Sequence, residues 1–525
     1  MPEQQTYLTP DIAPRLAAID IGSNSIRLVV AESDPRNHYR VLDEERETTR
    51  LGRALAAHGC LDETSMAATV DALRRFQAIA AGLQAEQVRA IATCAVREAE
   101  NGQEFCDLVR AQLGLEIDVI SAEEEADLAF QSVRRRSDLT GKNTLLADIG
   151  GGSTEIVIAS GEFVESVYAT PLGAVRLTEK FAAGQSLAGD NYGQMVRWID
   201  RELRRSCDKP SAPLHLMVGS GGTFTSLGAM VMAARGLSRL PAAGCQASRA
   251  DVRHLIDRLR KMPAKLRREM PGLSADRADI IVPGLVVIDR IMRRFRVNVL
   301  QVHPYGVRDG MLLQMFDALR GDGTPAPFRL DEQLDRFADM CGADAARGKY
   351  VAELAAQIYD AVALRFHLDP HDVRLLRTAA RLQDVGYLIG YEKHHKHSYH
   401  LILHSRLDAF RPEEIELIAN VARYHRGSEP KNRHENFRKL APPDRHRVRV
   451  LAGVLRIAGG LDRSHNRTVR AVQAGGAGRV VELAVSAAES PEVDLWAARR
   501  RVGLLETALD AEISVEWAGN LVANY

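Results

Sequence analysis

Two stretches of the chain carry nearly the same pattern, AIDIGSNSIRLVV at residues 18–30 and LADIGGGSTEIVI at residues 146–158. In each, an apolar run ends at an aspartate, Asp20 or Asp148, and glycine and small residues separate it from a second β-branched run. This pattern predicts a β-hairpin with a tight turn after the aspartate. Glycines allow successive backbone N–H groups of such a turn to point at an anion. One such turn is typical of an ordinary hairpin, but two copies indicate two related subdomains that face each other across a cleft.

A third glycine-rich loop follows the second hairpin. Residues 214–218 predict a buried strand, the sequence GSGGT comes next, and a helical pattern begins at Phe224. A strand, a glycine turn and a helix N-terminus together form an anion site. The residues predicted to bind phosphate in the three loops are Gly22, Ser23, Asn24, Ser25, Gly150, Gly151, Gly152, Ser153, Thr154, Gly219, Ser220, Gly221, Gly222 and Thr223.

With the sequence GVRDG at residues 306–310, these motifs resemble the exopolyphosphatase / guanosine pentaphosphate phosphohydrolase (Ppx/GppA) family. The resemblance extends from about residue 16 to 313, where four separate motifs occur in the family's order, and a weaker resemblance continues to about residue 464. It implies an α/β fold, namely the duplicated ribonuclease-H-like fold of the actin-like, sugar-kinase and heat-shock ATPase (ASKHA) superfamily.

The composition excludes a global electrostatic attraction. The 525 residues include 69 basic and 69 acidic side chains, so we expect no nucleic-acid or membrane partner. Any polyanion site must be a local basic patch, and residues 134–136, 258–268, 290–296 and 393–400 are candidates. Most such clusters are simply solvated helix faces.

The six cysteines are scattered, without a Cys-x-x-Cys pair, and are read as reduced thiols. The N-terminus lacks the basic and apolar regions of a signal peptide, and no apolar run approaches the about 18 residues of a membrane span. A cytoplasmic protein is therefore expected.

The predicted organisation has four parts. Residues 1–138, with a returning segment at about 302–320, form the first actin-like subdomain, and residues 139–301 form the second. A linker rich in turn formers is expected at residues 321–327. An all-α domain at 329–466 and a small α/β domain at 467–525 follow, the latter with one helix at 495–509.

Hydrolysis of a phosphoanhydride needs a cradle for the phosphoryl group, a divalent ion that offsets charge, and a group that orients water. Asp148 and Glu155 are the predicted ligands of Mg²⁺ or Mn²⁺, directly or through waters. Since they lie seven residues apart on one hairpin, they reach the same end of the cleft only if the turn is wide.

The candidate general base lies in the sequence ISAEEEA at residues 120–126, where a strand passes into a helix. Acids at a helix start are also explained by the helix dipole. The resemblance assigns the water-activating role to Glu125, with Glu124 as a structural neighbour. Ala122 stands where the family usually has glycine, which bears on the geometry of this turn.

Arg97 matches a family arginine near the phosphates, and its planar guanidinium suits that role. A surface salt bridge is the alternative. We assign Arg308, which lies in a comparable setting between glycines, to holding the cleft together.

The helical part resembles an HD-type domain, but its metal motif is degenerate. Gln383 and Asp384 form the adjacent pair, Arg347 replaces the first histidine, and Gly459 replaces the last aspartate. Glutamine and arginine are poor ligands, so we predict no metal site there.

Instead, the helical domain predicts a path for a long polyanion. Helix capping or pairing with Glu413, Glu414 and Glu416 is the alternative role of these side chains. The family resemblance implies help from a partner copy, so a homodimer is expected. The predicted polyanion track consists of His394, His395, Lys396, His397, Arg423, His425 and Arg426.

The function implied is an exopolyphosphatase, which releases terminal orthophosphate from linear inorganic polyphosphate. Hydrolysis of guanosine pentaphosphate to tetraphosphate is the alternative within the family. A kinase or ATPase of the same fold is disfavoured by the short second subdomain and the Glu125 motif. A non-catalytic polyphosphate or alarmone sensor is disfavoured because Glu125, Asp148 and Glu155 are all present.

Overall fold

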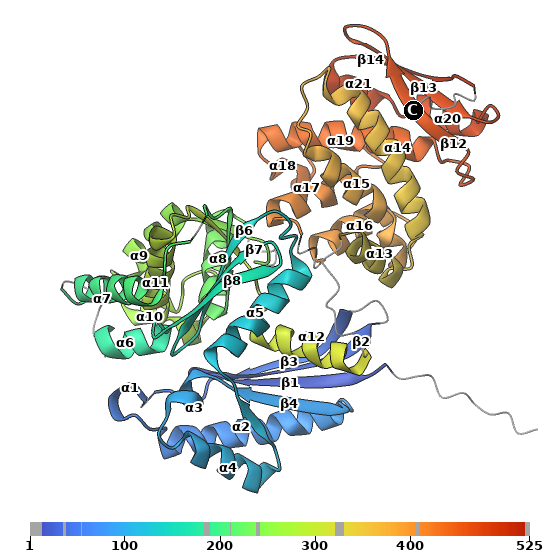
Figure 1. Ribbon diagram of the computed structural model, residues 1–525. Helices are drawn as coiled ribbons and strands as arrows, with labels where there is room; N and C mark the ends of the chain where they lie inside the picture. Colours follow the sequence, from blue (N-terminus) through green and yellow to red (C-terminus); the bar gives the residue numbers. More distant parts are fainter. Residues whose placement is uncertain are drawn as a thin grey trace, which may run out of the picture. The chain divides into compact units, whose positions relative to one another are not determined.

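The computed structural model describes residues 13–34, 38–53, 55–182, 190–210, 212–237, 242–320, 330–405, 407 and 409–519 (Figure 1). The chain divides into two compact units, Met1–Phe328 and Arg329–Tyr525. The linker expected at residues 321–327 lies outside the described residues. No helix in the described parts is long and apolar enough to cross a membrane.

The first unit begins with a five-stranded mixed sheet. Its strands are β1 (Arg15–Ile21), β2 (Ile26–Asp34), β3 (His38–Glu47), β4 (Gln87–Ala92) and β5 (Ile117–Val119), in the order β3-β2-β1-β4-β5. Alternation along β1 sends Ala17, Ile19 and Ile21 to one face and Leu16 and Ala18 to the other. Helices α2 (Glu63–Gly82) and α4 (Gly102–Leu113) cover the first of these faces.

A six-stranded sheet repeats this plan. Its strands are β6 (Asn143–Ile149), β7 (Thr154–Ser160), β8 (Phe163–Thr170), β9 (Leu216–Ser220), β10 (Gln246–Ser248) and β11 (Val299–Val302), in the order β10-β11-β9-β6-β7-β8. In both sheets an antiparallel hairpin lies beside a parallel strand, so β6, β7, β8 and β9 correspond to β1, β2, β3 and β4. The longer helices after β8 are α6 (Ala174–Ala182), α7 (Asp190–Ser206), α8 (Gly222–Ala234), α9 (Arg249–Leu259) and α11 (Ile281–Arg294).

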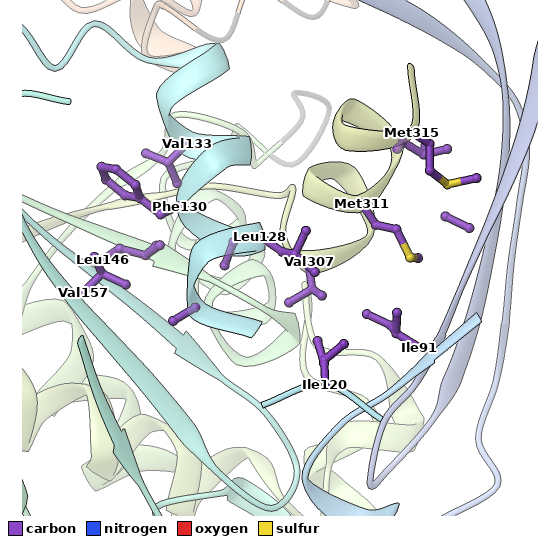
Figure 2. Packing of buried hydrophobic residues seen from close by; sticks show 14 of the residues in the cluster. Ile91, Ile120, Leu128, Phe130, Val133, Leu146, Val157, Val307, Met311 and Met315 are labelled. Carbon is purple, nitrogen blue, oxygen red and sulfur yellow. The ribbon is translucent and has the colours of Figure 1, made fainter. Parts of the chain in front are cut away.

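Two helices connect the sheets of the first unit. Apolar side chains of α5 (Ala122–Arg136) and α12 (Val307–Arg320) form one cluster with residues of both sheets, and Figure 2 shows Phe130 and Met311 within it. At Gly310 a side chain would overlap the carbonyl of Leu128, so glycine permits the two helices to approach closely. The helix that carries Glu125 is thereby fixed between the two sheets.

The second unit is mostly helical before a small sheet. Its longer helices are α13 (Leu330–Met340), α14 (Ala345–Ala363), α15 (Asp372–Leu382), α16 (His394–Leu403), α17 (Pro412–Arg423) and α19 (Pro442–Gly460). Strands β12 (Val469–Gly475), β13 (Val480–Ala487) and β14 (Glu512–Trp517) form the sheet. Short helices in the two units are α1 (Leu55–His58), α3 (Cys94–Glu98), α10 (Ala264–Arg267), η1 (Ala275–Arg277), η2 (Val385–Leu388) and α18 (Glu435–Arg438).

The sequence predicts one helix at residues 495–509, and this prediction is wrong. The structure has two short helices there, α20 (Glu492–Arg499) and α21 (Gly503–Leu509). Both pack against α19. Gly460 lies against Ala498 and Gly453 lies against Leu505, with room for no side chain at either glycine. A break at residues 500–502 allows both short helices to lie on α19, a tertiary requirement that the local sequence pattern does not reveal.

Candidate active site

A cavity of about 130 Å³ lies in the first unit between the two hairpin turns. It brings together many of the residues predicted from sequence, which are Gly22, Ser23, Asn24, Ser25, Glu125, Asp148, Gly150, Gly151, Gly152, Ser153, Ser220, Gly221 and Gly222. Five predicted residues do not line it, and these are Arg97, Thr154, Glu155, Gly219 and Thr223.

The two turns share one geometry. The N–H of Gly22 donates to the carbonyl of Ser25 over 3.3 Å, and the N–H of Gly150 donates to that of Ser153 over 3.0 Å. The turns are also close together, since a side chain at Gly152 would lie 2.5 Å from Cys94 Sγ and 2.9 Å from Ser23 Oγ. The sequence repeat therefore builds one narrow site from two turns.

The third loop joins β9 to α8 at the same cavity. Gly221 has a φ of +90° and caps α8, and a side chain there would lie 2.6 Å from Asp148 Oδ1. The N-terminus of α8 thus opens beside a carboxylate and a phosphate-type turn. Gly219 and Thr223 serve packing instead, because Gly219 lies against the ring of Phe224 and Thr223 lies against Gly284.

Asp148 and Glu155 are direct cross-strand partners in the β6–β7 hairpin. Residues 150–153 span the turn between the strands, so both side chains point to the same face. Asp148 Oδ2 accepts a hydrogen bond from Ser220 Oγ over 3.1 Å, and burial raises the pKa of Asp148 to about 6. Thr154 is buried beside them, and its hydroxyl donates to the carbonyl of Leu172.

Burial also raises the pKa of Glu155. Its Oε1 is buried without a hydrogen-bond partner in the described part of the chain. An acceptor oxygen left unpaired in a buried position fits a cation, and carboxylates are the ligands that Mg²⁺ and Mn²⁺ prefer. The pair therefore suits a divalent ion.

Glu125 lies in the first turn of α5. Ser121 caps this helix, and Glu124 accepts from the backbone N–H of Ser121, so Glu124 has a structural role. Ala122 is the first helical residue and has no positive φ, so alanine suits the position. Glu125 is 8% exposed, and burial, followed by the charge of Glu155, raises its pKa well above the usual range.

Arg97 contacts the candidate base rather than the cavity. Its Nη1 lies 3.2 Å from Glu125 Oε2 and donates to the carbonyl of Ile120 over 2.7 Å. The charge of Arg97 opposes the rise in the pKa of Glu125. The structure thus places this arginine beside the carboxylate.

Three arginines from separate segments line the cavity, and the sequence analysis did not include them among the phosphate ligands. They are Arg27, Arg277 and Arg308. Arg308 also donates to the carbonyl of Leu28 and pairs with Glu44, so it links α12 to the first sheet. Burial and neighbouring arginines lower the pKa of Arg27 to about 10 and that of Arg277 to about 9.

One sequence signal could have found Arg27. It is the cross-strand partner of Asp20, as Glu155 is of Asp148, so it occupies the corresponding position of the first repeat. Arg277 has no such signal, because it comes from a 3₁₀ helix between α10 and α11.

The predicted polyanion track is only partly brought together in the second unit. His394, His425 and Arg426 line a cavity of about 560 Å³, whereas His395, Lys396, His397 and Arg423 do not. The guanidinium of Arg423 lies over the rings of Tyr399 and Tyr424 instead. Gly459 and Gln383, two of the positions that depart from the HD pattern, line the same cavity.

The duplicated α/β fold and its phosphate-type turns facing a carboxylate cluster define a phosphate-handling protein of the actin-like type. The comparisons agree, since residues 29–319 match the Ppx/GppA phosphatase family and residues 331–491 match domain III of that family. The chain belongs to the Ppx/GppA phosphatase family.

Two similar proteins carry the names of different phosphatases. The chain is 30% identical to exopolyphosphatase 1 of Mycobacterium tuberculosis over 316 residues, which cover 59% of this chain and 90% of the relative. It is 26% identical to the guanosine-5'-triphosphate,3'-diphosphate pyrophosphatase of Vibrio vulnificus over 416 residues. These residues cover 79% of this chain and 81% of the relative.

Solved structures of two similar proteins match part of the chain. The Aquifex aeolicus member of the Ppx/GppA family has a TM-score of 0.51 and 27% identity, and the match covers 59% of this chain and 99% of that one. An exopolyphosphatase from Cytophaga hutchinsonii has a TM-score of 0.53 and 24% identity, and the match covers 58% of this chain and 98% of that one. This match supports the fold alone.

Proposed function

We propose that this phosphatase is an exopolyphosphatase, which hydrolyses the terminal phosphoanhydride bond of linear inorganic polyphosphate. The observation that carries the proposal is the position of Glu125. Its carboxylate lines a cavity walled by two glycine turns and three arginines, and Arg97 contacts it from outside the cavity.

In the mechanism we infer, the turns bind and orient the terminal phosphoryl group. The backbone N–H groups of residues 22–25 and 150–153 and the N-terminus of α8 supply donors. Arg27, Arg277 and Arg308 supply positive charge for the non-bridging oxygens. Donors fixed by the fold before the substrate arrives stabilise the charge of the transition state without reorganisation.

Glu125 acts as the general base. Water attacks phosphorus in line with the leaving chain, an O–P bond forms, the terminal anhydride bond breaks, and the water proton passes to a carboxylate oxygen of Glu125. Burial, followed by the charge of Glu155, raises the pKa of Glu125, which makes its carboxylate a stronger base toward the water proton. The shortened chain leaves, and no covalent intermediate is needed.

Asp148 and Glu155 are proposed to hold Mg²⁺ or Mn²⁺. When bound, such an ion supplies charge neutralisation for the phosphate oxygens. The unpaired Oε1 of Glu155 and the orientation of Asp148 by Ser220 support this role. Because an adjacent cation favours ionised carboxylates, the ion also lowers the pKa values that burial raises.

Hydrolysis of guanosine pentaphosphate is the second candidate, and the long match to the Vibrio vulnificus relative supports it. The cavity favours an inorganic chain. Among the described residues that line it, Tyr305 is the only aromatic, and the guanidinium of Arg136 lies 3.7 Å from the centre of that ring. The covered face is therefore not free to stack on a guanine.

The test is phosphate release with Mg²⁺ from long-chain polyphosphate and from guanosine pentaphosphate, each with the wild type and Glu125→Ala. Glu124→Ala is the matched control, because Glu124 caps the helix and does not line the cavity. Release from polyphosphate that collapses only in Glu125→Ala supports the proposal. Release from the nucleotide alone selects the second candidate, and binding without release from either contradicts both.

A further inference from the structure

Three side chains of the second unit converge on a point outside the proposed active site. One ligand atom from each of Asp384, His394 and His425 lies within 4.8 Å of the other two. His394 Nε2 is 3.3 Å from Asp384 Oδ1, and His425 Nε2 is 3.9 Å from the same oxygen. Two imidazoles and one carboxylate thus face a single centre.

The backbone fixes the orientation of both histidines. Nδ1 of His394 lies 3.2 Å from the carbonyl of Tyr391, and Nδ1 of His425 lies 2.6 Å from that of Ala422. A carbonyl oxygen only accepts, so each Nδ1 carries the hydrogen. In the neutral ring Nε2 then presents a lone pair to the centre. Backbone carbonyls orient metal-binding histidines in this way.

His394 supplies a second, independent observation. It is 1% exposed, and its Nε2 has no hydrogen-bond partner in the described part of the chain, although it lies 3.3 Å from Asp384 Oδ1. A lone pair beside a carboxylate oxygen is repulsive unless a proton or a metal cation lies between them. The buried polar atom therefore points to a missing positive charge.

Arg347 contacts the same aspartate, and its presence led the sequence analysis to predict no metal site in this domain. Its Nη1 lies 2.5 Å from Asp384 Oδ2 and its Nε lies 2.8 Å from Asp462 Oδ2. It therefore occupies one oxygen of Asp384 and leaves Oδ1 to the histidines. The absence of a metal was predicted from Arg347, Gln383 and Gly459, but the converging residues are a different set.

We propose that Asp384, His394 and His425 hold one divalent transition-metal ion, Zn²⁺ by ligand type, whose open coordination positions take a phosphate oxyanion. Two imidazoles and a carboxylate with an open position are a donor set that zinc uses in catalytic sites. Tetrahedral zinc ligands at about 2.0–2.1 Å lie roughly 3.4 Å apart, which the His394–Asp384 pair already matches.

The arginines around the proposed metal site favour an oxyanion as a further ligand of the metal. Asp384, His394 and His425 all line the 560 Å³ cavity, whose other lining side chains include Arg426, Arg456, Arg463, Arg500 and Arg501. Burial lowers the pKa of Arg501, and the charges of neighbouring arginines lower it further; these are Arg463, Arg456, Arg426 and Arg347. A metal ion alone would add positive charge to this cavity, whereas an oxyanion bound to the metal neutralises the arginines.

The test uses the full chain and two metals. Asp148→Asn is the starting protein, because it weakens the ion site proposed between the first unit's sheets. We expect one Zn²⁺ per chain after dialysis, and with Co²⁺ a visible band much stronger than an all-oxygen site gives. His394→Ala and His425→Gln are expected to weaken Zn²⁺ binding roughly 100-fold or more.

His397→Ala is the matched control, since His397 lies on α16 but does not line the cavity. Zn²⁺ is expected to raise the unfolding midpoint of the starting protein and of the control, and to leave both ligand variants unchanged. Equal Zn²⁺ content in His394→Ala and His397→Ala, with both variants folded by circular dichroism, overturns the metal site. These readouts do not depend on polyphosphatase activity.

A second titration tests the oxyanion. Inorganic phosphate is added to the Co²⁺ form and is expected to shift the visible band, with an apparent affinity that falls about tenfold in Arg501→Ala. Val493→Ala is the control, because Val493 is exposed on neighbouring α20 and does not line the cavity. A band unaffected by phosphate overturns the oxyanion part of the proposal.

Discussion

Arg97 and Glu125 form an ion pair of 3.2 Å next to the cavity, and the charge of Arg97 opposes the large rise in the pKa of Glu125. An arginine placed in this way acts on the charge of the carboxylate and does not line the cavity. It connects the end of β4, through α3, to the start of α5.

Arg97→Gln is expected to raise the pKa of Glu125 further, because the opposing charge is lost. A base works only when deprotonated, so activity falls at low pH, and the acidic limb of the pH–rate profile moves up by about one unit. Phosphate release measured from pH 5 to 9 checks this. Arg97→Lys keeps the charge and is expected to move the limb less. An unchanged limb in Arg97→Gln contradicts the tuning role.

Ser220→Ala is expected to raise the Mg²⁺ concentration needed for half-maximal activity about tenfold, because Ser220 orients Asp148. Ser226→Ala is the control, since Ser226 donates to the carbonyl of Gly222 on α8 and does not contact the carboxylate. The measurement is the Mg²⁺ dependence of phosphate release. A shift of the same size in both variants indicates a general disturbance of α8.

Gly222→Ala is expected to raise KM for polyphosphate about tenfold, while the protein stays folded. A Cβ at this position overlaps the guanidinium of Arg277, which must leave the cavity. The loss of one charge-assisted hydrogen bond corresponds to about 1.5 kcal/mol or more. Gly82→Ala is the control, because no atom lies near its added Cβ. Steady-state kinetics with unchanged KM in Gly222→Ala would falsify the role of Arg277.

We expect the stability of the first unit to fall in acid, because His303 is buried there. Its Nε2 lies 2.8 Å from Ser132 Oγ, and burial lowers its pKa to about 3. In the unfolded chain a histidine has a pKa of about 6.5, so between these values only the unfolded state binds the proton. The free energy of unfolding therefore falls as pH falls through this window, by up to about 1.4 kcal/mol per unit.

His303→Gln removes this proton uptake. Urea unfolding at pH 7 and pH 5 is expected to show a loss on acidification that is about 2 kcal/mol smaller in His303→Gln than in the wild type. The exposed His254→Gln is the control. Equal losses in His303→Gln and the wild type would mean that His303 titrates alike in both states.

Arg347→Met is expected to destabilise the second unit by about 3–5 kcal/mol, because Asp462 is 0% exposed and loses its charged partner. Urea unfolding of the full chain measures the effect. Arg500→Met is the control, since Arg500 is exposed and packs on Trp496. Adding Asp462→Asn to Arg347→Met is expected to recover part of the loss, and no recovery would locate the cost elsewhere.

The two hairpins could be predicted because their signal is local. Asp148, its glycine turn and the strands on either side are contiguous, and the cross-strand pairing of Asp148 with Glu155 follows from a four-residue turn. The capped start of α5 is likewise written in residues 121–124. The local pattern therefore located the hairpin carboxylates and the helix start, whereas the role of Glu125 as candidate base came from the family resemblance.

Two of the three arginines of the cavity, Arg277 and Arg308, could not be predicted as phosphate ligands in the same way. Arg277 reaches it from a 3₁₀ helix and Arg308 from α12, so only tertiary packing brings them together. The grouping of Asp384, His394 and His425 has the same cause, because three separate segments supply it. The composition shows how many basic residues the chain has, but it does not show which of their side chains line the same cavity.

The two repeats have the same backbone plan but opposite charge at one corresponding position, where Arg27 faces Asp20 and Glu155 faces Asp148. The two ends of a linear inorganic polyphosphate chain are chemically identical, so the chain has no direction of its own. At this position the first hairpin carries a cation and the second carries an anion, so the two hairpins differ in charge. In this protein the divergence of a duplicated hairpin would therefore decide how a terminal phosphoryl group is oriented between the two turns.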